Sequence, residues 1–286
     1  MLSSFGNRLF NTVNAVLLSL LGLATIYPLW REISRSLSSG DAVMRGGMFL
    51  WPVDFRLDAY HIIIKSDYLW TAYGNSLFIT IVGTVLALLL TSSTAYPLAK
   101  RTLPLKKLFM LIVLFTMIFS GGLIPTYLVM KDLHLINSLW AIIVLNLISA
   151  FNVIVMLSFI RTIPEELEES AMIDGANPIR IFFTIILPLC KPVLATLALW
   201  MAVSLWNNFF QSFIYLNDKV HMTLPVLLRQ IIAGQVDAEA MGELNAASSD
   251  SVIAATIVVS LIPILMVYPF LQRFFVKGAM IGSVKG

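Results

Sequence analysis

Charged residues are scarce in this chain. Of its 286 residues, 12% are charged and 58% are hydrophobic, whereas a soluble domain carries about 25% charged residues. A water-soluble body of this size cannot be covered by so little polar surface. The composition therefore excludes a soluble globular protein and indicates a membrane protein.

Cysteine, histidine and catalytic motifs are scarce as well. The single cysteine, Cys190, excludes an internal disulfide or a thiolate metal cluster, and His61, His134 and His221 lack ligand spacing. The phosphate-binding motif G-x-x-x-x-G-K-[ST] and the zinc motif H-E-x-x-H are both missing from the sequence. We therefore expect no metal ion, no cofactor and no enzyme activity in this chain.

Six apolar runs are long enough to cross a bilayer, and none contains Asp, Glu, Lys or Arg. They cover residues 12–30, 73–98, 108–130, 135–160, 192–216 and 251–271. Within the third run, Gly121, Gly122 and Pro125 favour close helix approach or a break. The sequence predicts one all-α transmembrane domain, 1–286, with six spanning helices.

The distribution of basic residues predicts the orientation. Lys100, Arg101, Lys106 and Lys107 follow the second run within one short turn, which places that turn in the cytoplasm. Both termini and segment 161–191 are then cytoplasmic, while segments 31–72 and 217–250 lie outside. We expect a multi-pass protein of the cell membrane.

Segment 161–191 is charged and punctuated, unlike the runs beside it. It contains E-E-L-E-E-S-A-M-I-D-G-A-N-P, residues 165–178. Thr162 and Glu165 have the spacing of a capping box, and Gly175 is suited to a left-handed helix end. Asn177 and Pro178 are suited to the start of a second helix. The sequence predicts two short helices with a corner at Gly175.

The second helix, predicted to run to Leu187, has an apolar stripe. Ile179, Phe182, Phe183 and Ile186 recur on one face, which needs an apolar surface to lie against. The helix pair can pack under its own bundle as an interfacial element or dock into a groove of a cytoplasmic partner. The glutamates argue in part against the interface, where Lys and Arg are usual.

Three motifs resemble a known family. The pattern Glu169-Ser170-Ala171, Gly175, Ile185 and Leu187-Pro188 resembles the cytoplasmic signature loop of permease subunits of binding-protein-dependent ABC importers; Ser170 stands where alanine is common. G-G-L-I-P-T-Y (121–127) and W-N-N-F-F (206–210) resemble maltose-type carbohydrate permeases. The resemblance is strongest to the oligosaccharide importers with lipoprotein receptors of Gram-positive bacteria.

The resemblance implies a type I ABC importer permease fold with a two-helix coupling loop, 161–191. It implies two cytoplasmic ATPase subunits that bind ATP and Mg, a second related permease in a heterodimer, an extracellular sugar-binding lipoprotein and surrounding lipid, and no nucleic acid. ATP would then drive alternating access to a sugar, an oligosaccharide by resemblance. The residues that it assigns to ATPase coupling are Glu165, Glu166, Glu169, Ala171, Asp174, Gly175, Ile179, Phe182, Phe183, Ile186, Leu187 and Pro188.

Polar side chains within two runs are candidates for the sugar pathway. Amides, hydroxyls and aromatic faces hold sugars, but buried amides also cross-link membrane helices, so both interpretations stay open. Asn208, Gln211 and Ser212 are expected to share one face of a continuous helix. The candidates are Asn146 and Asn152 in the fourth run, and Ser204, Trp206, Asn207, Asn208 and Gln211 in the fifth.

An ion-coupled secondary transporter or channel subunit is the alternative. Proton-coupled carriers generally place carboxylates or histidines within their spans, and the six runs contain no charged residue. Sodium can be bound by carbonyls and hydroxyls, so this alternative stays open at the level of sequence. The length of segment 217–250 indicates a docking surface, and the resemblance implies that outer loops such as this segment meet the receptor; deletion of residues 234–244 should then abolish receptor-stimulated ATP hydrolysis.

Overall fold

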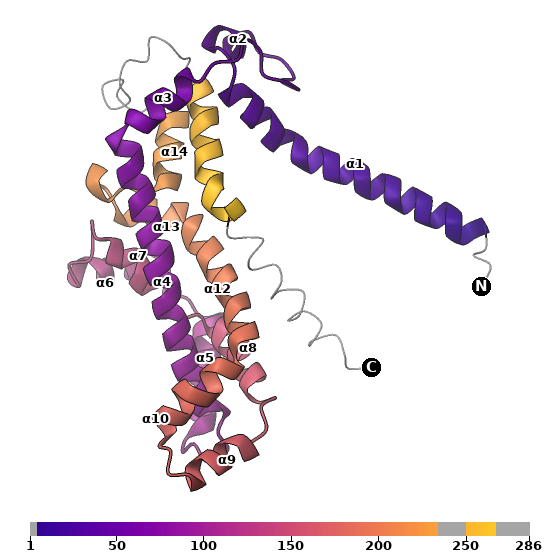
Figure 1. Ribbon diagram of the computed structural model, residues 1–286. Coiled ribbons are helices and arrows are strands. Elements are labelled where there is room, and N and C mark those ends of the chain that lie inside the picture. Colours follow the sequence, from indigo (N-terminus) through magenta and orange to yellow (C-terminus); the bar gives the residue numbers. More distant parts are fainter. Residues whose placement is uncertain (1–4, 234–249, 267–286) are drawn as a thin grey trace. The chain divides into compact units, whose positions relative to one another are not determined.

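The computed structural model describes residues 5–233 and 250–266, and every regular element within these ranges is helical (Figure 1). This confirms the all-α fold. The chain divides into two compact parts, Met1–Trp70 with Leu228–Ile262 and Thr71–Leu227 with Pro263–Gly286. Residues 234–249 of segment 217–250, which is expected to meet a receptor, lie outside the described residues, as does the sixth predicted span beyond residue 266.

The first part begins with one long helix, α1, Phe5–Ser36. Its most apolar stretch buries nothing against other described residues, as expected of a helix surrounded by lipid or by another subunit. Tyr27 and Trp30 near its end donate hydrogen bonds to the carbonyls of Met48 and Leu50, at 2.7 and 2.6 Å. The remaining elements are α2 (Gly40–Arg45), α3 (Asp58–Lys65), the start of α4 (Asp67–Ala99), the end of α14 (Leu224–Ile232) and most of a helix at Asp250–Met266.

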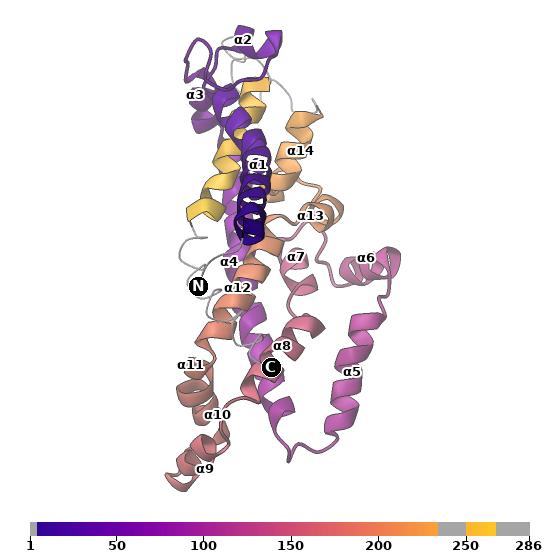
Figure 2. The ribbon, with the colours of Figure 1, turned by 90° about the vertical axis from the view of Figure 1, so that its right-hand side faces the viewer.

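The second part holds the rest of α4 and the helices that follow it in the chain. In both Figure 1 and Figure 2, α9 and α10 lie together at one end of this part, away from α6, α7 and α13. Its further elements are α5 (Lys106–Ile118), α6 (Leu123–Asp132), α7 (Leu139–Leu145), α8 (Ala150–Ile160), α9 (Glu166–Ile173), α10 (Pro178–Ile181), a π-helix (Phe182–Ile186), α11 (Leu187–Leu189), α12 (Lys191–Trp206), α13 (Phe209–Tyr215) and a 3-10 turn (Lys219–His221).

Breaks divide the third, fourth and fifth apolar runs. The helix axes bend by 113° between α5 and α6 and by 52° between α7 and α8, and Asn207 and Asn208 separate α12 from α13. At the first break Gly122 has a φ of 82°, so the glycines expected to permit a break do so. Within the described residues, two helices are long and apolar enough to cross a membrane, or five if each bent pair is one span; the count of six stays a prediction.

One apolar core joins the bundle to the loop of residues 161–191. It draws on α4, α8 and α12 and on the second helix of the loop, with Ile181 and Ile186 fully buried in it. The loop is therefore packed against the helices of the bundle. The buried members of this core are Ala95, Leu98, Val153, Met156, Leu157, Ile160, Ile181, Phe182, Ile186, Cys190, Val193 and Leu197.

Candidate functional site

The corner of loop 161–191 is a left-handed helix end. Gly175 has a φ of 81°, and two backbone bonds close the end of α9, from Ala176 N–H to Ala171 O at 2.9 Å and from Gly175 N–H to Met172 O at 3.0 Å. This pair of bonds is the Schellman pattern. The predicted corner is confirmed.

The second helix of the loop starts as predicted and then loosens. Asn177 Oδ1 accepts from Arg180 N–H at 2.8 Å, with Pro178 in the first turn. At Phe182–Ile186 the helix widens to π geometry, where Leu187 N–H donates to Phe182 O. Pro188 follows and has no N–H to continue a regular ladder. The chain stays helical as far as Leu189.

The predicted capping box is wrong. The Thr162 hydroxyl donates to Phe159 O at 2.7 Å, because Thr162 still lies in the turn that closes α8, and no side chain caps α9 at Glu165. Glu165 instead lies 3.2 Å from Arg101 Nε in a solvent-exposed ion pair. A sequence spacing does not reveal that the first residue of a capping box is already engaged by the preceding helix.

The apolar stripe of the loop is divided between two surroundings. Phe182 and Ile186 are buried, at 6% and 0% exposure, against the bundle, whereas Ile179 and Phe183 are 70% and 53% exposed. The expectation that all four share one buried face is therefore wrong. Phe182 and Ile186 lie along one edge of the stripe, which packs into the core, and Ile179 and Phe183 lie along the other edge.

Several large apolar side chains of the loop are left uncovered. We call Met172, Ile173, Ile179 and Phe183 the exposed loop residues; Ile173 is 87% exposed. Glu166, Glu169 and Asp174 are exposed on the same loop. Of the other residues assigned to coupling, Ala171 and Leu187 pack partly against the core, and Pro188 is exposed.

A buried carboxylate attaches α9 to the end of α4. Glu168 is 7% exposed; it accepts a hydrogen bond from Tyr96 Oη at 2.9 Å and forms an ion pair with Lys100. Lys100 Nζ also lies 4.5 Å from the centre of the Tyr96 ring. Burial lowers the pKa of Lys100, and the charge of Glu165 acts against that shift. The sequence analysis did not single out Glu168, which is one glutamate among four.

Three amides meet where two helix breaks lie together. Asn146 ends α7, and its Nδ2 donates to Gln211 Oε1 at 2.7 Å and to Ile142 O at 2.7 Å. Asn208 caps α13 by accepting from Gln211 N–H at 3.2 Å, and its Nδ2 donates to Gln211 Oε1 at 2.6 Å. We call Asn146, Asn208 and Gln211 the amide cluster. The predicted shared face is wrong in its geometry, because Asn208 is a cap at a break and not a residue of a continuous helix.

The other pathway candidates lie apart from these bonds. Asn207 is exposed, and its Nδ2 donates to Val203 O at 2.9 Å; Ser204 is also exposed. Trp206 is 6% exposed and meets Tyr73 edge-on at 5.6 Å. Asn152 is buried on α8. These positions stay candidates on the sequence argument alone.

A glycine that the sequence analysis passed over allows α4 to approach this region. A Cβ at Gly83 would lie 2.8 Å from Leu205 Cδ1 and 3.8 Å from Ile143 Cγ1. Leu205 precedes the break that carries Asn208, and Ile143 precedes Asn146. Small residues at such contacts let helices pack closely in membranes. A lone glycine within an apolar run has no signal in a hydrophobicity profile.

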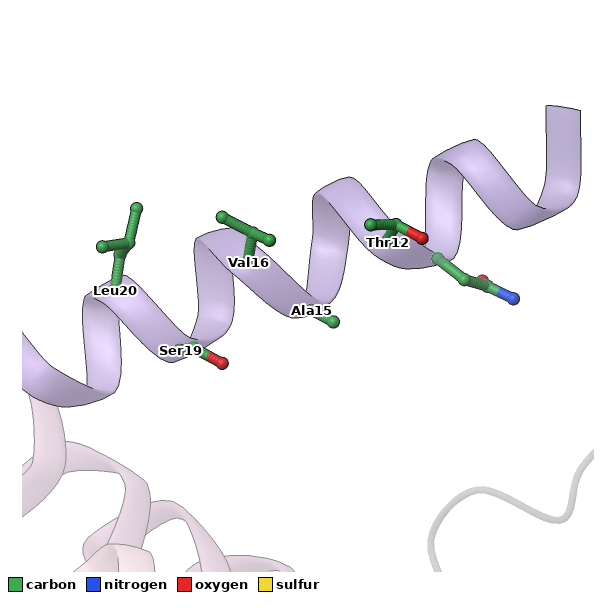
Figure 3. Close-up of a pocket in the computed structure, with 6 residues that line it drawn as sticks. Thr12, Ala15, Val16, Ser19 and Leu20 are labelled. Atoms are coloured by element: carbon green, nitrogen blue, oxygen red, sulfur yellow. The ribbon is translucent and has the colours of Figure 1, made fainter.

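A shallow hollow on the described surface is lined by residues of α1 alone. Figure 3 shows Thr12, Ala15, Val16, Ser19 and Leu20, which line it, all projecting from that helix. With no second element to close it, this hollow is the surface of a helix and not a ligand site.

Long apolar helices and bent pairs of apolar helices indicate a membrane protein. A family profile matches residues 98–280, and the chain belongs to this family, described as the inner membrane component of binding-protein-dependent transport systems. Family membership sets aside an ion-coupled secondary transporter.

Two relatives align with the chain over nearly its whole length. The polygalacturonan/rhamnogalacturonan transport system permease protein YtcP of Bacillus subtilis is 42% identical, over 98% of this chain and 99% of that protein. Protein LplC of the same organism is 41% identical, over 98% and 96%.

A solved structure is similar in both fold and sequence. It is a crystal structure of a bacterial ABC transporter involved in the import of the acidic polysaccharide alginate, and one of its chains matches with a TM-score of 0.91 and 37% identity. The match covers 96% of this chain and 99% of that one.

Proposed function

We propose that this chain is a permease subunit of an ABC importer that carries an acidic oligosaccharide across the cell membrane. Relatives named for polygalacturonan/rhamnogalacturonan transport and for alginate import support an acidic sugar. An extracellular sugar-binding lipoprotein delivers the substrate to outer segments 31–72 and 217–250, and both termini of the chain lie in the cytoplasm.

The exposed loop residues are the observation that carries the transport mechanism. Ile173 and Ile179 flank the corner at Gly175 and are 87% and 70% exposed, although apolar side chains of this size favour burial. A groove on a cytoplasmic ATPase subunit covers them, and Glu166 and Glu169 meet basic residues at its rim. The ATPase subunits bind ATP and Mg. Their closure moves the loop, which changes the side of the membrane to which the bundle is open.

The amide cluster is the proposed contact with the sugar. The three amides provide hydrogen-bond donors and acceptors for the hydroxyl and carboxylate groups of a sugar. They lie at helix breaks, where backbone groups are not all used in helical hydrogen bonds. Gln211 accepts from both asparagines, so a sugar that displaces one of these bonds replaces it with an equivalent one. Asn207 and Ser204, both exposed, extend the pathway.

A second, related permease completes the pathway. The most apolar stretch of α1 is uncovered within the described chain, and α5 has no buried residue. Two permeases in a heterodimer cover part of this surface, and lipid covers the remainder.

Uptake by proteoliposomes that contain both permeases, the ATPases and the receptor tests this function. Labelled oligogalacturonate should accumulate only with internal ATP, and a neutral oligosaccharide of equal length should not. Gln211→Leu should lower uptake about tenfold, in keeping with a buried hydrogen-bonding site that loses its partners. Ser158→Ala is the matched control, because the Ser158 hydroxyl donates a hydrogen bond to Ile154 O of its own helix. Equal uptake of both sugars would contradict the acidic substrate.

A further inference from the structure

The contact between the coupling loop and α4 is more than a packing contact. We propose that Tyr96, Lys100, Glu168 and Phe182, together the loop junction, transmit movement of the loop to α4, with Glu168 as the positioning residue. This inference rests on the proposed docking of the loop on ATPase subunits. It adds the path by which movement leaves the loop.

Glu168 can hold α9 to α4 because its carboxylate is buried. Its side chain is 9% exposed, and a carboxylate removed from water is stable only when it is paired and hydrogen-bonded. Both partners of the carboxylate, Tyr96 and Lys100, come from α4 and the residue after it, one helical turn apart. Separation of α9 from α4 would break the ion pair and the hydrogen bond of Glu168 together.

The second helix of the loop contacts the same turn of α4. The rings of Tyr96 and Phe182 lie 5.3 Å apart at 38°, and Phe182 opens the π-helix. Tyr96 therefore contacts both halves of the loop, α9 through its hydroxyl and the second helix through its ring. A rigid movement of the loop must either carry the end of α4 with it or break both contacts.

A neighbouring ion pair joins the same two segments but is exposed to solvent. Arg101 and Glu165 also join the end of α4 to the start of α9, but their side chains are 85% and 65% exposed. Exposed ion pairs of this kind contribute little to the free energy of unfolding. A cleft of about 430 Å³ lies beside both pairs, lined by Lys100, Arg101 and Lys106 and by glutamates of the loop. Arg101 is thus a matched control for Lys100, one residue away in the sequence.

The ratio of sugar transported to ATP hydrolysed tests the loop junction in the complete complex. With Glu168→Gln, or with Lys100→Met and Glu168→Gln together so that no buried charge is left unpaired, the complex should assemble and hydrolyse ATP, while sugar transported per ATP falls about fivefold, within the range for substitutions that alter coupling. Arg101→Met should leave the ratio unchanged. Lys100→Arg should retain the ratio, and the exchange Lys100→Glu with Glu168→Lys should restore part of it. A purely structural role would instead lower the amount of assembled complex and leave the sugar transported per ATP unchanged.

Two results would overturn the proposal. One is an unchanged ratio both in Glu168→Gln and in the double variant Lys100→Met with Glu168→Gln. The other is loss of the ATPase subunits with Glu168→Gln, because Glu168 would then be a docking residue. Failure of the proposed docking is a separate outcome, seen if the exposed loop residues can be made charged and the ATPases still co-purify.

Discussion

The two sides of the coupling loop use the same kinds of residue for opposite purposes. Phe182 and Ile186 are buried against the bundle, whereas Ile179 and Phe183, from the same apolar pattern, are exposed. The acids divide in the same way: Glu168 is buried and paired, and Glu169 is exposed. The inner side attaches the loop to its own helices, and the outer side is left for a partner. Substitutions on the inner side should therefore impair folding of the permease, and substitutions on the outer side should impair binding of its partner.

The largest effect is expected on the inner side. Ile186→Asp places a carboxylate without a partner at a position with 0% exposure, at a cost of several kcal/mol. The permease should not accumulate in the membrane, as measured by immunoblot of membrane fractions. Thr184→Asp, which adds the same charge at an exposed position two residues away, should accumulate normally. Normal amounts of Ile186→Asp would show that the core does not need the loop.

Substitutions on the outer side should leave folding intact but prevent binding of the ATPase subunits. The double variant Ile179→Asp with Phe183→Asp changes two exposed residues, so the permease should reach the membrane in normal amounts. Co-purification of the ATPase subunits should fall at least about tenfold, as expected when interface anchors are removed. Thr102→Asp, exposed in the turn after α4, is the control. Retention of the ATPases would mean that the outer side is not the docking surface.

A smaller effect is expected at the corner between the two sides. Gly175 has a φ of 81°, and an added Cβ would meet nothing within 4 Å, so Gly175→Ala costs only the left-handed backbone, about 1–2 kcal/mol. The melting temperature of the complex and its uptake should fall modestly. Gly74→Ala, in a helix with equally open space, should not destabilise. Equal behaviour of the two variants would contradict the role of the corner.

Local features of the loop were predictable, and contacts between distant segments were not. The corner at Gly175 and the start of the second helix at Asn177 depend on residues within one turn, so their types predict them. The stripe was predicted to be buried as a whole, but its burial depends on which edge packs against the helices of the bundle, and residues distant in the sequence decide that. Glu168 owes its role to Tyr96 and Lys100, which are remote in the sequence.

The same distinction holds for the amide cluster. The candidates Asn146, Asn208 and Gln211 were identified by residue type, and the structure brings them together. Their geometry was not predictable, because a hydrophobicity profile treats residues 192–216 as one helix and does not reveal the break at Asn207 and Asn208. The close approach of α4 to Leu205 and Ile143 at Gly83 was not predictable, because it depends on residues that are distant in the sequence.

Covering of position 183 by the ATPase tests the central claim most directly. In a Cys190→Ala background, Phe183→Cys should react rapidly with a water-soluble maleimide when the permease pair is purified without ATPases. The rate should fall at least about tenfold in the complete complex, since an interface anchor is shielded from solvent. Thr102→Cys should react at the same rate in both. An equal rate at position 183 with and without the ATPases would contradict the account.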